Sequence, residues 1–349
     1  MVKRIILDVD TGTDDACAIM LALKSPELKI EAITSVMGNS TIEKTTRNTC
    51  KVVEIVTESR DRTHEDIPIA MGMHRPLIRS HFSHEKKGNK LKEGYHGSDG
   101  LGGLIDSGYL KPPKLKPVKQ HAIDLIIAKV MENPGQITLL PVGPLTNIAI
   151  VLLKEPKVAK NIEEIIHMGG VFSLNPYGYG NITPMSEFND WCDPEAAKIV
   201  FESGAKITAV GLDVTTFPSA RITENHLRRL QPEDPVDDFI IRMCRSRIER
   251  QEGGVGAIPG TIVGANIHDA LAVAVAIDRN LVETQPYYVH VVTMVPDNAP
   301  TRGMTIADKR PQTILKRKEE SGFYAPNIDV CTRINGDKWT DFFIERIKA

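Results

Sequence analysis

Short apolar runs that alternate with helix-like segments are the feature of this sequence that most limits its fold. Residues 4–9 and 30–36 have the length and composition of buried strands, and residues 14–23 and 42–56 after them have helical patterns. The alternation continues through residues 67–72, 122–131, 137–142, 164–168, 194–201 and 206–212. Strands alternating with helices form a sheet of mostly parallel strands. We therefore predict an α/β protein with an open, mostly parallel sheet flanked by helices, in one domain over residues 1–349.

The composition is that of an ordinary soluble globular protein and gives no sign of a membrane or nucleic-acid partner. Of the 349 residues, 41% are apolar and 25% charged, and the net charge is -2 with basic residues scattered along the chain. Apolar runs are too short for a membrane span, and the run at residues 5–7 is too short for a signal peptide. We expect no nucleic-acid or membrane partner.

The cysteines indicate a reducing compartment. There are five, an odd number, and they are widely spaced without a CxxC pair. Free thiols in the cytoplasm are the simplest interpretation.

Two long stretches interrupt the alternation and are candidates for functional loops. Residues 75–119 are polar and rich in Gly and His, whereas residues 171–181 are rich in Gly and Tyr. Loops of this length in a compact domain are often functional, so we expect both at the active site. The alternative is that they are tolerated surface insertions.

An acidic cluster follows the first predicted strand. Asp8, Asp10, Asp14 and Asp15 lie within eight residues, and their mutual repulsion is costly unless they are solvated, protonated or paired with a cation. Oxygen ligands favour calcium or magnesium over zinc. The alternative is a solvated, capped helix start. Asp269, beside His268, is a further ligand candidate, although such a pair is also typical of a helix cap.

Polar or glycine-rich residues also follow the other predicted strands. Gly38 and Asn39 follow the second strand, a Pro-Val-Gly-Pro segment begins at Pro141, and Met168 precedes two glycines. Ligands of open parallel sheets bind beyond the carboxyl ends of the strands. These groups therefore indicate a single site at one edge of the sheet.

Six sequence blocks in the same order resemble the inosine–uridine-preferring nucleoside hydrolases. The first is the segment from Asp8 to Ala16, with the acidic cluster. The others are Gly38-Asn39, the His-Gly loop at residues 95–103, residues 141–147, residues 180–197, and His268-Asp269-Ala-Leu-Ala. The blocks span residues 4 to about 280, and the tail resembles the family more weakly. The resemblance implies the fold of that family and hydrolysis of ribonucleosides to ribose and free nucleobase.

The resemblance also implies a role for each site residue. Ca²⁺ would be bound by Asp10, Asp15, Asp269 and the carbonyl of Val142, together with two ribose hydroxyls and a water. Asp14 would be the general base, Asn39 would orient the water, and His268 would assist departure of the base. The substrate-binding residues would be Asn181, Glu187, Asn189, Met168 and His96, with Asp8 as support. Relatives form dimers or tetramers, so a homo-oligomer is expected.

These roles are chemically consistent with cleavage of an N-riboside. The sugar becomes cationic in an oxocarbenium-like transition state, which nearby carboxylates stabilise. A bound metal ion makes water more acidic, so that a carboxylate can deprotonate it. A histidine with a pKa near neutrality suits protonation of the leaving base. A substrate that lacks the 2′ hydroxyl should therefore be poor.

Two regions depart from the family pattern. Residues 82–92 and 171–180 look inserted and are candidates to cover the site, the latter with Phe172, Tyr177 and Tyr179. The segment 236–252, where many relatives carry tyrosines that face the base, instead carries four arginines: Arg242, Arg245, Arg247 and Arg250. A solvated charged face explains them best, and contact with the base or a phosphate is the alternative.

Two other functions compete with nucleoside hydrolysis. The Asp8-Val-Asp10 segment resembles the start of haloacid-dehalogenase-like phosphatases, but Gly12 stands where they need Thr or Val. A nucleoside-binding protein without activity is the other alternative. A nicotinamide-dependent enzyme is disfavoured because aspartates replace the glycine fingerprint after the first strand.

Overall fold

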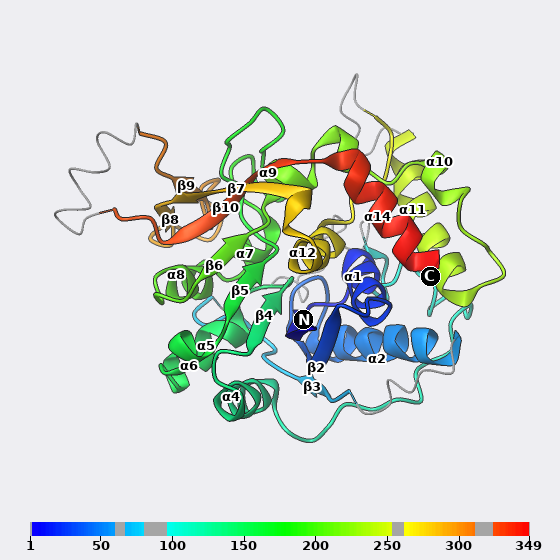
Figure 1. Cartoon of the computed structure of the whole chain (residues 1–349), viewed down its shortest axis with the longest axis horizontal. Helices are drawn as coiled ribbons and strands as arrows, with labels where there is room; N and C mark the ends of the chain where they lie inside the picture. Colours follow the sequence, from blue (N-terminus) through cyan, green and yellow to red (C-terminus); the bar gives the residue numbers. More distant parts are fainter. Residues whose placement is uncertain (1, 60–66, 80–95, 253–261, 311–323, 349) are drawn as a thin grey trace.

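The sheet at the centre of the molecule has eight strands in the order β3-β2-β1-β4-β5-β6-β10-β7. The computed structural model describes residues 2–59, 67–79, 96–252, 262–310 and 324–348. Neighbouring strands are parallel except β7, which runs antiparallel to β10 at one edge (Figure 1). The strands are β1 (Lys3–Val9), β2 (Leu28–Ser35), β3 (Ile69–Met71), β4 (Ile137–Pro141), β5 (Glu164–His167), β6 (Ile207–Ala209), β7 (Val282–Tyr287) and β10 (Ile328–Ile334). A separate hairpin pairs β8 (Val289–Val291) with β9 (Thr305–Ala307).

Helices cover both faces of the sheet, as the sequence pattern predicts. One face carries α1 (Thr13–Leu23), α2 (Ile42–Ser59), α11 (Pro235–Glu252), α12 (His268–Ile277) and α14 (Gly336–Lys348). The other carries α4 (Ala122–Glu132), α5 (Thr146–Lys154) and α8 (Pro194–Phe201). Shorter helices are α6 (Val158–Asn161), α7 (Phe188–Cys192), α9 (Leu212–Thr215) and α10 (Glu224–Leu227). The predicted α/β class and open, mostly parallel sheet are therefore confirmed.

Successive side chains of β1 point to opposite faces of the sheet and enter two different hydrophobic cores. Ile5, Leu7 and Val9 belong to the core beneath α1 and α12, whereas Ile6 belongs to the core beneath α4 and α5. All four are essentially inaccessible, as expected for a strand buried on both faces. β1 ends at Val9, so Asp10 lies just beyond the last residue of the strand.

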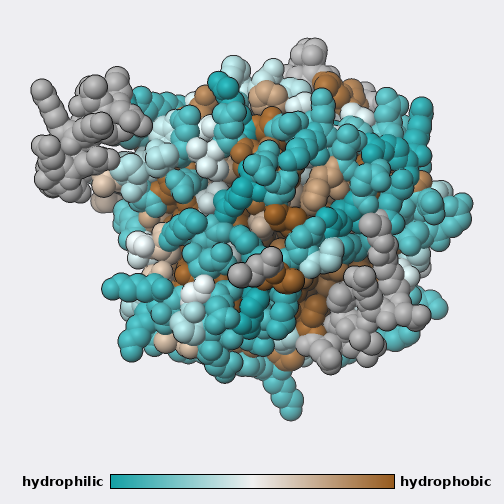
Figure 2. All heavy atoms as spheres, viewed as in Figure 1, coloured by the Kyte–Doolittle hydropathy of each residue, from teal (hydrophilic) through white to brown (hydrophobic). Residues whose placement is uncertain are grey.

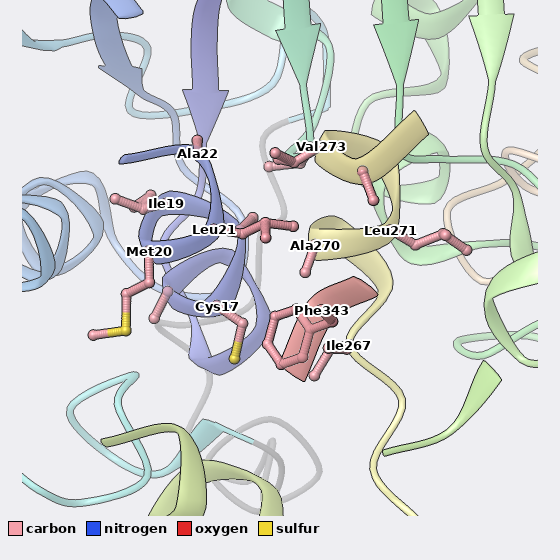
Figure 3. Packing of buried hydrophobic residues seen from close by; sticks show 14 of the residues in the cluster. Cys17, Ile19, Met20, Leu21, Ala22, Ile267, Ala270, Leu271, Val273 and Phe343 are labelled. Atoms are coloured by element: carbon pink, nitrogen blue, oxygen red, sulfur yellow. The ribbon is translucent and has the colours of Figure 1, made fainter. Parts of the chain in front are cut away.

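The packing of α1 against α12 brings distant parts of the chain together. Figure 3 shows Leu21 of α1 pointing towards Ala270 of α12, with Phe343 of α14 beside Ile267. Both helices are almost entirely buried and contain several alanines, so their backbones approach closely. Asp14 and Asp15 lie in the first turn of α1, and Asp269 lies in the first turn of α12. The packing of the two helices therefore sets the distance between the two acidic segments.

The surface is mainly hydrophilic on the face drawn in Figure 2, where apolar side chains lie scattered among charged ones. Among the helices described, none combines the length and the apolar character needed to cross a membrane.

Replacing Phe343 by Ala should lower the free energy of unfolding by about 3–5 kcal/mol, because the ring is fully buried and leaves a cavity. Urea denaturation measures this change. Phe342→Ala is the matched control, since Phe342 is only partly buried against the same core and should cost less. Equal losses for the two variants would contradict the packing described.

Candidate active site

The carboxyl ends of four adjacent strands bring the predicted residues to one edge of the sheet. Asp10 follows β1, Asn39 follows β2, Val142 follows β4 and Met168 follows β5. Asp8 stands opposite Pro141 in the β1–β4 register, so Asp10 and Val142 leave neighbouring strands at the same level. The convergence expected from the sequence is therefore present.

Asp15 accepts three of the described hydrogen bonds in the acidic cluster. Its Oδ1 accepts from the backbone N–H of Asp10 at 3.1 Å. Its Oδ2 accepts from the N–H of Gly12 at 2.9 Å and from Nδ2 of Asn39 at 3.0 Å. Asp15 thus caps α1, but it is completely buried, so a solvated helix start does not describe it.

Asp10 is held against the loop that follows β2. Its Oδ2 accepts from the backbone N–H of Asn39 at 2.6 Å. A Cβ atom on Gly38 would lie 2.0 Å from that oxygen, so only glycine allows the loop to approach this closely. The Gly38-Asn39 pair therefore places one amide donor on each of two aspartates.

Three buried carboxylates form a group that could bind a metal ion. One oxygen from each of Asp14, Asp15 and Asp269 lies within 4.8 Å of the other two. Burial, followed by the neighbouring aspartates, raises the pKa of Asp269 well above its usual value, and burial raises that of Asp15 to about 6. Asp269 lies inside α12, whose N-cap is Ile267, so it does not cap the helix. An oxygen-only set of this kind fits a hard divalent cation.

Arg247 enters this cluster from α11, which was not expected. Its guanidinium donates to Oδ1 of Asp14 at 2.9 Å and also to Oγ1 of Thr13. Burial would raise the pKa of Asp14, but the positive charge of Arg247 and the two nearby histidines lower it to about 2. Asp14 is therefore ionised at neutral pH, whereas Asp15 and Asp269 keep their protons to a higher pH than ordinary carboxyl groups.

The two predicted histidines are both close enough to Asp14 to lower its pKa. Nδ1 of His96 accepts from the backbone N–H of Thr13 at 3.2 Å, and Nδ1 of His268 lies 2.8 Å from Oγ1 of Thr215 in α9. Both rings are buried. Burial lowers the pKa of His268 to about 4, so its ring is neutral at pH 7.

The residues predicted to bind ribose only partly converge. Nδ2 of Asn189 donates to the carbonyls of Val142 at 2.8 Å and Met168 at 3.0 Å. The Glu187 carboxylate caps α7, accepting from the N–H of Asn189 at 2.8 Å, and burial raises its pKa to about 7. Asn181 is exposed, and its described hydrogen bond is from its backbone N–H to Ser186.

Asp8, predicted as a support, and His167 are held by residues for which no role was predicted, among them Thr34, Asn147 and Asp190. Oδ1 of Asp8 accepts from Thr34 at 2.5 Å and from Asn147 at 2.8 Å, and burial raises the pKa of Asp8 to about 7. His167 bridges the carbonyl of Pro141 and the carboxylate of Asp190, with both side chains inaccessible. Only the position of His167 next to Met168 could have drawn attention to it.

One aromatic residue of the loop at 171–181 does not face the site, contrary to the expectation for Phe172. Phe172 is buried in the core beneath α8, so it does not face a substrate. Tyr177 stacks edge-on against Phe217, with ring centroids 4.8 Å apart, and Tyr179 is exposed. The 82–92 insertion and Tyr95 lie outside the described residues.

The arginines of α11 divide into surface and buried groups. Arg242 pairs with Asp238 and lies over the ring of Tyr109, and Arg245 pairs with Glu224 on the surface, as a solvated face predicts. They line a surface depression of about 430 Å³ that includes none of the site residues. Arg247 is the exception, and the side chain of Arg250 lies outside the described residues.

Comparison with known proteins gives the family of the chain. The family model described as inosine-uridine preferring nucleoside hydrolase matches residues 5–341. The pyrimidine-specific ribonucleoside hydrolase RihA of Salmonella arizonae is 34% identical over 349 residues, covering 100% of this chain and 99% of its own. The pyrimidine-specific ribonucleoside hydrolase RihB of Escherichia coli is 33% identical over 311 residues, 88% of each chain.

Solved structures agree with this assignment. A purine-preferring ribonucleoside hydrolase from Gardnerella vaginalis has a TM-score of 0.81 at 29% identity, covering 99% of this chain and 98% of its own. A plant nucleoside hydrolase, the PpNRh1 enzyme, has a TM-score of 0.82 at 29% identity, with both chains covered completely.

The chain is therefore an enzyme of the nucleoside hydrolase class, which cleaves N-glycosidic bonds. It belongs to the inosine-uridine preferring nucleoside hydrolase family. This assignment excludes the phosphatase and nicotinamide alternatives.

Stabilisation by a divalent cation should grow as the pH rises from about 4 to about 7. Asp15 and Asp269 keep protons in the folded protein that the unfolded chain has released, so cation binding expels protons and strengthens with pH. At a concentration about 100-fold above Kd the gain is about 3 kcal/mol. Urea denaturation with chelator or with excess Ca²⁺ measures it.

Two aspartate variants provide the controls for this experiment. Asp269→Asn should lose the cation effect, whereas Asp278→Asn, at a surface pair with Lys338, should keep it. A cation effect that is constant over this pH range would contradict a cation site made of protonated carboxyls.

Proposed function

We propose that this chain hydrolyses the N-glycosidic bond of ribonucleosides in a calcium-dependent reaction that gives ribose and a free nucleobase. One observation carries the proposal: a buried, oxygen-only aspartate cluster at the edge of the sheet where the strands have their carboxyl ends. Membership of the nucleoside hydrolase family supports the same reaction.

The proposed calcium ligands are Asp10, Asp15, Asp269 and the carbonyl oxygen of Val142. When bound, the ion supplies a more acidic water and anchors the ribose hydroxyls. Buried carboxylates with raised pKa values fit such a cation, because its charge offsets the burial and the mutual repulsion that otherwise keep them protonated. Asn189 fixes the Val142 carbonyl through its amide, which leaves the second lone pair of that oxygen for a ligand.

Asp14 is the proposed general base. It is ionised at neutral pH, and it stands beside the other aspartates at the start of α1. Asn39 assists by orienting the attacking water, and its side chain is itself fixed by Asp15. The same carboxylates stabilise the positive charge that develops on the sugar as the bond to the base breaks.

His268 is proposed to assist the leaving nucleobase as a neutral hydrogen-bond donor. Its lowered pKa means that the ring is not protonated at pH 7 before the reaction begins. In the tautomer that carries its proton on Nε2, Nδ1 accepts from the hydroxyl of Thr215 and Nε2 donates. His96, whose Nδ1 accepts from the backbone N–H of Thr13, is proposed to lie near the nucleobase.

The ribose is proposed to be held by Asn181, Glu187 and Asn189, with Met168 packed beside it and Asp8 as a support behind the cluster. Glu187 and Asn189 are already ordered by hydrogen bonds, whereas Asn181 is exposed and would complete the site from the loop at 171–181. The loops at 75–119 and 171–181 are accordingly proposed to border the active site.

The cellular location and the oligomeric state are proposed from the cysteines and from the family. The five cysteines form no disulfide in this structure, which favours a reducing compartment, and we propose the cytoplasm and a role in nucleoside salvage. We also propose a dimer or tetramer by analogy with the family. Relatives are named both pyrimidine-specific and purine-preferring, so the preferred base is left open.

Ribose release from inosine, uridine, cytidine and adenosine, with and without chelator, tests the function. At least one ribonucleoside should release ribose, and chelator should abolish the release. Deoxyuridine should react at least about 100-fold more slowly than uridine, because it leaves buried polar groups unpaired. Binding without ribose release from any of them would identify a non-catalytic nucleoside-binding protein instead.

A further inference from the structure

The guanidinium of Arg247 joins three separate segments at the acidic cluster. It comes from α11 and donates to Oγ1 of Thr13, to Oδ1 of Asp14 at 2.9 Å and to the carbonyl of Asn266, just before α12. Its side chain is 7% exposed. Arginine suits such a position because its planar fork can hold several acceptors in fixed directions.

Asp14 is held differently from the other aspartates of the cluster. Asp15 accepts from backbone amides and from Asn39, and Asp10 accepts from the amide of Asn39. These neutral donors are local to the strand ends. Asp14 instead pairs with a charged group 233 residues away in the sequence. Its orientation therefore depends on where α11 packs.

The same guanidinium reaches His96 through Thr13. Oγ1 of Thr13 accepts from Arg247 and lies 3.2 Å from Nδ1 of His96, to which the Thr13 amide also donates. A side chain that moved out of this position would release both Asp14 and the contact that fixes His96.

We propose that Arg247 is a positioning residue for hydrolysis: it holds Oδ1 of Asp14, so that Oδ2 is the oxygen that accepts the proton of the attacking water, and it fixes His96 through Thr13. This inference rests on the proposed role of Asp14 as general base. The role is expected in the chemical step, because Arg247 contacts Asp14, the proposed general base, directly, whereas it reaches His96 only through Thr13.

Replacing Arg247 by Met should lower kcat about 100-fold and change KM by less than about threefold, since a misplaced base slows the chemical step. Arg245→Met is the matched control on the same helix, because Arg245 pairs with Glu224 at the surface and should keep the wild-type kcat. Steady-state ribose release gives both constants. A wild-type kcat for Arg247→Met, or a change confined to KM, would overturn the proposal.

Recovery of kcat distinguishes a positioning role of Arg247 from a variant that simply fails to fold. Arg247→Lys keeps the charge but not the fork, so it should recover only part of kcat. Guanidinium ion added to Arg247→Ala should raise kcat at least about tenfold, an effect that it should not have on Arg245→Ala. Absence of rescue in a folded Arg247→Ala protein would count against the proposal.

Variants of Asp14 distinguish this inference from the proposed function. Asp14→Asn should be nearly inactive, and adding Arg247→Met to it should cause little further loss, because Arg247 acts through Asp14. A fully active Asp14→Asn would refute the role of Asp14 as general base and, with it, this inference, whereas a wild-type protein that releases no ribose would refute the proposed function itself. An inactive Asp14→Asn together with a full further loss in the double variant would overturn only the role of Arg247. The double variant also removes both buried charges, so it remains testable if Arg247→Met alone does not fold.

Discussion

Repulsion among buried carboxylates is the constraint on which the rest of this structure depends. Asp10, Asp14, Asp15 and Asp269 are removed from water at one edge of the sheet, where uncompensated charge is very costly. Local amide donors hold Asp10 and Asp15, and a guanidinium balances Asp14. What these groups leave uncompensated appears as raised pKa values on Asp15 and Asp269. The fold thus maintains a strained arrangement that a cation would relieve.

The sequence was most informative where structure is determined locally. The acidic turn after β1 and the Gly38-Asn39 turn after β2 each lie within a few residues of a buried strand, so their positions follow from the strand pattern. The apolar runs gave strands correct to within a few residues at most ends. The antiparallel β7 and the insertion of β10 beside β6 have no local signature, and they were not predicted.

Contacts between distant segments explain what was missed at the site. Arg247 shares its helix with Arg242 and Arg245, which are surface residues, and nothing in the spacing marks it as the one that is buried. Phe172 was expected at the mouth of the site because of its loop, yet hydrophobic burial places it in the core. In both cases a contact with a distant part of the chain decides the orientation of one side chain.

The position of β10 has a consequence for how the protein is made. Every candidate site residue precedes residue 270, but β7 is hydrogen-bonded in the sheet to β10, which begins at Ile328. During synthesis from the N-terminus, the ribosome must release the last part of the chain before this edge of the sheet can close. A nascent chain that reaches Tyr287 already contains all the candidate site residues, but β7 would still lack β10, its partner in the sheet. Premature termination between Tyr287 and Ile328 would therefore give an aggregation-prone chain rather than a smaller enzyme.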